Sequence, residues 1–247
     1  GVGGHAFLLK GKTRFASLES PDKKLGYDVD YLYRGDKLCE TIHQQIEKAL
    51  KSHPVNMSRL LKGKPMIHSA WIWGRGQLVK KDATKHKMDV AVVTGTPLVK
   101  GLAKLKGYTI INADGVTGTL VTNYKNKIRA SLEALNQFDV VYCHVKSPDL
   151  ASHLKDVDLK IKVIETIDKE MIASIYESLK ECVHPTEVYV LSDLGTCSQS
   201  GEHFADVVPC LHAIAPWQRG YNTEEFDENA GKSSVILDDK QWIKRFL

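Results

Sequence analysis

Apolar residues recur with a helical period in the first third of the chain. They form one stripe along residues 37–51, which predicts an amphipathic helix there. Pro54 is expected to end that helix, and a shorter helix is expected over residues 57–61. An aromatic-rich run at residues 70–73 predicts a strand. The stripe consists of Leu38, Ile42, Ile46 and Leu50.

From residue 88 onward, short apolar runs alternate with amphipathic segments. This alternation indicates an α/β fold with a largely parallel, doubly wound sheet. Pro209 cannot donate a ladder hydrogen bond, so the apolar run at 207–214 is expected to form an edge strand. The other strands are expected at residues 89–93, 108–111, 138–145 and 187–192, and the helices at 97–106, 123–135 and 157–181. The apolar positions of the last helix keep a helical period from Val157 to Leu179.

The change in the hydrophobic pattern predicts that the chain has two parts. Residues 1–86 form an α+β segment, and residues 87–247 form the α/β part, with a boundary near residue 86. The chain begins without Met and without a signal-peptide pattern, so we expect a segment upstream to have been removed or left out.

Composition excludes several classes of protein. The 247 residues suffice for a substantial hydrophobic core, and no apolar run approaches the roughly 20 residues that cross a bilayer. An odd set of cysteines without C-x-x-C spacing argues against a disulfide framework or a zinc ribbon, so a reducing, intracellular compartment is expected. The five are Cys39, Cys143, Cys182, Cys197 and Cys210.

The charge pattern does not indicate nucleic-acid binding. Lys and Arg total 34 against 30 acidic residues, a formal charge of +4, and the signs are interspersed. The densest basic stretch, residues 80–87, contains Asp82 and no aromatic residue that could stack on a base. We interpret it as a solvated face, although the mild basicity would suit a large assembly.

Polar residues that could hold a metal follow two expected strands. Asp149 and His153 are spaced i, i+4 after one strand, and Asp193 and His203 follow the next. Ligands of open α/β sheets bind at the carboxyl ends of strands, and an oxygen and nitrogen donor set suits manganese, zinc or magnesium. The spacing also fits a purely structural reading, with Asp149 as a helix N-cap, His153 at the surface and Asp193 in a turn.

The segment from Phe138 to His153 resembles the D-x-V-x-x-H-x-K-x-x-D-x-x-x-H segment of the archaeal-type cofactor-independent phosphoglycerate mutases, members of the alkaline phosphatase superfamily. Further blocks match that family in order, at residues 53–59, 73–76, 100–103, 115–123, 162–168, 192–193, 203–209 and 226–228. The resemblance implies an alkaline-phosphatase-like sheet whose N-terminal strands are missing, preceded by part of an inserted α+β substrate lobe.

Family members are 2,3-bisphosphoglycerate-independent enzymes that interconvert 3-phosphoglycerate and 2-phosphoglycerate through a phosphoserine, with two divalent metals. The resemblance implies that Asp149, His153 and His203 hold the first metal and that Asp193 is one ligand of the second. It implies substrate-binding roles for Arg75, Lys100, Lys146, His53, Asn56 and Arg59. Arg75 between two glycines could also be a turn residue, and His53 a helix cap.

Departures from the family pattern shape the expected function. Leu194 replaces the histidine that follows Asp193, so the second metal site is expected to be lost, and Leu154-Lys155-Asp156 replaces Asp-Gly-Asp. The family's nucleophilic serine lies in the part that the chain lacks, so no catalytic nucleophile is assigned. We therefore expect a degenerate, catalytically inactive homologue that serves as a structural or binding subunit of a larger assembly. The alternative is the C-terminal part of an active glycolytic mutase.

The missing strands also imply a partner. Parallel strands without their neighbours would expose unpaired edges, so we expect a second polypeptide or the N-terminal half to cover them. Phosphoglycerate would bind only to an active protein.

Overall fold

The computed structural model describes residues 21–24, 27, 35–74, 76, 87–217, 227 and 229. The chain divides into two compact units, one of residues 4–78 and one made chiefly of residues 79–247. The predicted boundary near residue 86 falls in residues 77–86, outside the described residues, and stays a prediction.

The first unit contains a short 3₁₀ turn, Pro21–Lys24, and the helices α1 (Lys37–Lys51) and α2 (Pro54–Leu61). The α1 prediction is confirmed, and the Asp36 carboxylate caps the helix by accepting from the backbone N–H groups of the first turn. Helix α2 begins three residues before the expected start, because Pro54 occupies its first position instead of only ending α1. The strand expected at 70–73 is wrong, since only Trp73 makes an isolated bridge.

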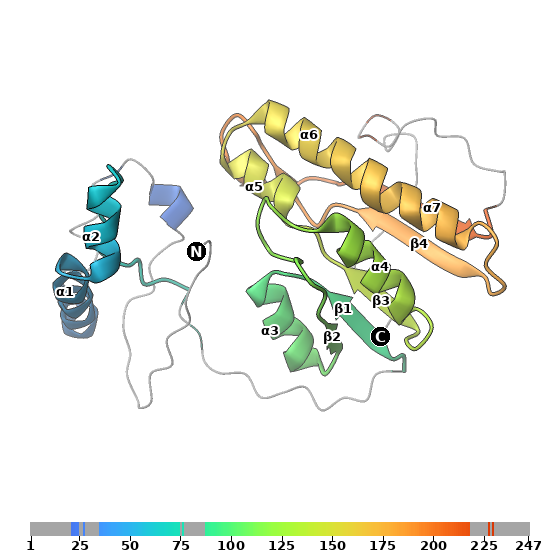
Figure 1. Ribbon diagram of the computed structural model, residues 1–247, viewed down its shortest axis with the longest axis horizontal. Coiled ribbons are helices and arrows are strands. Elements are labelled where there is room, and N and C mark those ends of the chain that lie inside the picture. Colours follow the sequence, from blue (N-terminus) through green and yellow to red (C-terminus); the bar gives the residue numbers. More distant parts are fainter. Residues whose placement is uncertain are drawn as a thin grey trace. The chain divides into compact units, whose positions relative to one another are not determined.

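The second unit is built on a parallel sheet of three strands in the order β2-β1-β3. The strands are β1 (Val90–Val93), β2 (Thr109–Ile111) and β3 (Val140–Cys143), and every residue of the central strand β1 is buried. Helices α3 (Pro97–Lys106) and α4 (Tyr124–Ala134) connect them, with α4 in contact with all three strands. Figure 1 shows this βαβ arrangement, which confirms the predicted alternation.

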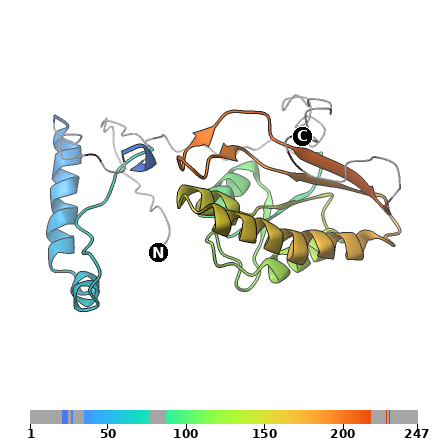
Figure 2. The ribbon, with the colours of Figure 1, turned by 90° about the horizontal axis from the view of Figure 1, so that it is seen from above.

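The expected long helix is present as α6 (Val157–Ile167), a π-helical turn η3 (Asp168–Ile172) and α7 (Ala173–Leu179). It runs without a break beside strand β4 (Thr186–Leu191) (Figures 1 and 2). The predicted apolar stripe is only partly buried. Its first positions, Val157, Ile161 and Ile164, are each about half exposed, whereas Met171 of η3 packs into the core with Tyr124 and Ile128 of α4.

Two antiparallel ribbons complete the unit. β4 pairs with β7 (Cys210–Ala215), and β5 (Gly195–Thr196) pairs with β6 (His203–Phe204). The strand expected at 207–214 is therefore shifted and starts after Pro209, which has no N–H for the ladder. Within the described part of the chain β4 pairs only with β7, so the sheet is less continuous than the alternation predicted.

All five cysteines are free thiols. Among the described residues, no helix combines the length and apolar character that a membrane crossing needs.

Candidate metal centre

A short helix, α5 (Ser147–His153), carries the first two candidate ligands. It starts four residues after β3, with Pro148 in its first turn. The buried Ser147 hydroxyl lies 2.6 Å from the Tyr124 hydroxyl of α4, which anchors the start of α5 on the core. Asp149 and His153 lie one helical turn apart and therefore face the same side, as the i, i+4 spacing predicts.

The β5–β6 ribbon carries the third candidate, His203. His203 lies directly opposite Thr196 in the antiparallel register. Residues 197–202 close the ribbon, with Cys197 N–H donating to Glu202 O at 2.9 Å and Gly201 N–H donating to Cys197 O at 2.7 Å. Gly201 has a φ of +75°, a left-handed conformation that suits glycine.

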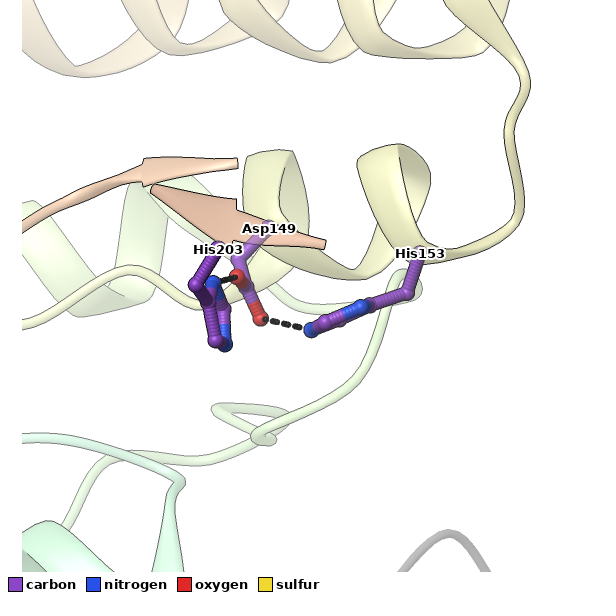
Figure 3. Close-up of side chains that lie close together, drawn as sticks. All are labelled: Asp149, His153 and His203. Atoms are coloured by element: carbon purple, nitrogen blue, oxygen red, sulfur yellow. Dashed lines mark ion pairs between the residues drawn. The ribbon is translucent and has the colours of Figure 1, made fainter. Parts of the chain in front are cut away.

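Helix α5 and the ribbon bring the three side chains together. One ligand atom from each of Asp149, His153 and His203 lies within 4.8 Å of the other two. In Figure 3 the Asp149 carboxylate lies between the two imidazole rings. Asp149 Oδ2 is 3.4 Å from His153 Nε2, and Asp149 Oδ1 is 3.7 Å from His203 Nδ1. The rings meet edge to face, with centroids 4.8 Å apart.

The surroundings of Asp149 favour its ionised form. Burial alone would raise the pKa of this carboxyl, but hydrogen bonds from the Lys146 ammonium and the Thr196 hydroxyl outweigh burial, and the pKa is lowered. Thr196 Oγ1 donates to Asp149 Oδ1 at 2.9 Å, and Lys146 Nζ contacts Oδ2 directly. The Asp149 carboxylate is therefore ionised at neutral pH and offers a negative charge to a cation.

The hydrogen bonding of His153 fits a metal ligand. Its Nδ1 lies 2.7 Å from the backbone carbonyl oxygen of Gly201, which can only accept, so Nδ1 carries the hydrogen. In the neutral ring Nε2 then carries a lone pair that faces Asp149 Oδ2, the oxygen that Lys146 Nζ also contacts. A divalent cation held by Nε2 and Oδ2 would take over from Lys146 in neutralising the carboxylate. A borderline cation such as Mn²⁺ or Zn²⁺ matches this donor set.

Asp193 lies outside this cluster, at the exposed end of β4, and its charge acts on His144. Burial lowers the pKa of His144, while Asp193 opposes that shift. His144 Nδ1 lies 3.2 Å from Thr94 Oγ1 and 3.4 Å from Thr96 Oγ1. The sequence reasoning gave His144 no role, although its place at the end of β3 could have drawn attention to it. Asp193 stays a predicted ligand of a second site.

The two predicted lysines differ in their contacts. Lys146 pairs with Asp149, whereas Lys100 Nζ donates to Asn112 Oδ1 at 2.9 Å. Lys146 thus lies at the cluster, beside the carboxylate that a cation would use. Substrate roles for both stay predictions.

The predicted substrate residues of the first unit have varied surroundings. Asn56 is 1% exposed and uses its amide to bond the backbone of Leu50 and Ile67, which holds α2 in place. Its substrate-binding role stays a prediction. His53 is exposed and caps α2, where its Nδ1 accepts from Val55 N–H. Arg59 Nε donates to Pro65 O at 2.9 Å. Arg75 lies outside the described residues.

Known proteins resemble this chain over most of its length. The chain is 33% identical over 244 residues to the 2,3-bisphosphoglycerate-independent phosphoglycerate mutase of Methanosarcina mazei, covering 96% of this chain and 61% of that protein. It is 34% identical over 214 residues to phosphoglycerate mutase 2 of the same kind from Methanothermobacter thermautotrophicus, covering 84% and 53%. The chain thus spans about half to three-fifths of the length of such relatives.

A solved structure also resembles this fold. The PH0037 protein from Pyrococcus horikoshii aligns with a TM-score of 0.63 at 28% identity, covering 78% of this chain and 51% of that one. The family model of the metalloenzyme superfamily matches residues 17–233, a range that includes all three clustered residues. The chain therefore belongs to the metalloenzyme superfamily, and its fold is of the alkaline-phosphatase-like α/β type.

Proposed function

We propose that the chain binds one divalent cation through Asp149, His153 and His203 and forms part of a 2,3-bisphosphoglycerate-independent phosphoglycerate mutase. The observation that carries this proposal is the convergence of the three side chains, with one ligand atom from each lying within 4.8 Å of the others. The names of the relatives supply the substrate class, phosphoglycerate.

The chemistry of the residues supports phosphoryl transfer. When bound, a divalent cation would supply positive charge to the oxygens of a transferring phosphoryl group. Lys146 contacts Asp149 in the present arrangement, and a cation at the carboxylate would compete with the ammonium group for the same oxygen. Lys146 released in this way would be available to neutralise a substrate phosphate, the role that the family resemblance implies. Lys100, His53, Arg59 and Arg75 are further candidates for substrate binding.

One observation favours a second candidate, an inactive binding subunit. Leu194 directly follows Asp193, is 39% exposed and offers no lone pair to a metal. A site that lacks a protein ligand binds its metal much more weakly. This candidate keeps the first metal but not the mutase reaction.

Calorimetric titration of the metal-free protein with Mn²⁺ tests the proposal. We expect one equivalent to bind, and His203→Ala to weaken binding at least tenfold because one of three ligands is lost. His184→Ala, which removes an exposed histidine from the loop before β4, is the matched control and should bind Mn²⁺ normally. Equal affinity of the wild type and His203→Ala would contradict the metal site.

A mutase assay separates the two candidates. The protein isolated from its source, with Mn²⁺ bound, is supplied with 3-phosphoglycerate. Formation of 2-phosphoglycerate supports the active enzyme, whereas metal binding without turnover supports the inactive subunit.

A further inference from the structure

Thr196 occupies an unusual place beside the candidate metal centre. It is 7% exposed and lies opposite His203 in the β5–β6 ribbon, so the two side chains share one face of the ribbon. Its single hydroxyl lies 2.9 Å from Asp149 Oδ1 and 2.9 Å from His203 Nδ1. One buried side chain therefore links a ligand on α5 to a ligand on the ribbon.

The backbone around Thr196 is fixed from two sides. Lys160 of α6 donates from Nζ to the Thr196 carbonyl oxygen at 3.0 Å. In the neighbouring pair, the Phe204 ring lies over Gly195, where a Cβ atom would come within 2.3 Å of the ring. The ribbon thus holds the threonine hydroxyl at one position relative to both ligands.

Only one placement of the hydrogens fits this link when the aspartate is ionised and the imidazole is neutral. A threonine hydroxyl has one hydrogen, and a carboxylate can only accept, so the hydroxyl donates to Asp149. The hydroxyl oxygen then accepts from His203, which places the hydrogen of His203 on Nδ1. The remaining nitrogen, Nε2, keeps its lone pair for a metal. His153 has the same tautomer through Gly201.

We propose that Thr196 is a positioning residue that sets the tautomer of His203 and orients Asp149, so that both are ready to bind a cation. Partners of this kind fix ring orientation and raise the basicity of a ligand, and their loss commonly lowers metal affinity about 10–100-fold. The inference rests on the proposed metal site, but its tautomer component can be measured without metal.

The first test is the tautomer of His203 in the wild-type, metal-free protein at a pH where the ring is neutral. Proton–nitrogen NMR correlations of the imidazole distinguish a hydrogen on Nδ1 from one on Nε2. We expect His203 to have its hydrogen on Nδ1, and to become a mixture of tautomers in Thr196→Val. A hydrogen on Nε2 of His203 in the wild type would overturn the inference, whatever the stability of any variant.

The second test is Mn²⁺ affinity by calorimetry. Thr196→Val keeps the shape but removes the hydroxyl, and we expect binding 10–100-fold weaker. Thr196→Ser restores the hydroxyl and should stay within about threefold of the wild type. Unchanged affinity in Thr196→Val, beside normal binding by the wild type, would overturn the inference and leave the metal site standing. A wild type that binds no Mn²⁺ but shows the Nδ1–H tautomer would contradict the proposed function and leave the tautomer assignment intact.

Discussion

Lys155 adopts a left-handed backbone conformation, with a φ of 59°, directly after α5. Its N–H donates to Ser152 O and the next N–H donates to Ala151 O, the pattern of a helix that ends in a Schellman-type turn. Glycine is the usual residue at such a position, because a Cβ atom costs roughly 1–2 kcal/mol there. Lys155 therefore occupies a position at the end of α5 that favours glycine.

We therefore expect Lys155→Gly to stabilise the protein. Relief of the left-handed strain is partly offset by the larger entropy of glycine in the unfolded chain, which leaves a net gain of about 0.5–1 kcal/mol. Denaturant unfolding measures this difference. Lys162→Gly, an exposed lysine within α6, is the control and should lose about 1 kcal/mol. Destabilisation by Lys155→Gly would show that the lysine side chain contributes more than its backbone strain costs.

At the scale of elements, two glycines near β1 have opposite surroundings. Gly95 follows β1, and a Cβ atom there would lie 2.0 Å from the backbone carbon of Thr117. The loop after β1 and the loop at 117–118 thus pass each other at a distance that only glycine allows. Gly101 lies within α3, where a Cβ atom would meet nothing within 4 Å.

This contrast predicts opposite effects of the same substitution. Gly95→Ala should destabilise the protein by about 2 kcal/mol or more, because one backbone must move away from the other. Gly101→Ala should stabilise it by about 0.5–1 kcal/mol, because alanine favours helix. Thermal unfolding of both variants checks the pair. Equal effects of the two substitutions would mean that the loops after β1 are not packed as described.

Hydrophobic periodicity misplaced the buried face in the first half of the long helix. Ile161 and Ile164 belong to the predicted stripe but are half exposed, whereas Val163 between them is buried. From Val163 onward the inward residues follow at steps of four through the π-helical turn η3, with Ile167, Met171 and Ile175. A π turn lengthens the helical repeat, so this four-residue step keeps one face toward the core, which a regular period of 3.6 residues does not predict.

At the scale of the whole molecule, the parallel sheet has open edges within the part of the chain that the structure describes. Among the described residues, β2 and β3 are its outer strands, and each pairs on one side only, with β1. Unpaired edges of this kind attract another strand. We propose that a second polypeptide, or a further segment of the same protein, pairs with one of them.

The mass of the protein isolated from its source tests this proposal. Native mass spectrometry should give a mass above the 27.6 kDa of this chain, and denaturing mass spectrometry should then distinguish a longer chain from a bound partner. A species of 27.6 kDa under both conditions would contradict the proposal.

The sequence by itself determined most helices and the parallel strands of the α/β part, together with the candidate ligands that follow them. Local periodicity and proline or glycine positions were enough for α1, α3, α4 and the three parallel strands, because those signals act within a few residues. The i, i+4 spacing of Asp149 and His153 and the family-like motif were enough to select three candidate ligands, which the fold brings together.

The tertiary structure decided which of these groups meet. Thr196 and Gly201 acquire their roles from hydrogen bonds to residues that lie 47 and 48 positions away along the chain. Asn56 is buried through hydrogen bonds to the backbone that no sequence pattern predicts. Such contacts depend on how separate elements pack, and the order of residues along the chain does not encode that packing in any local signal.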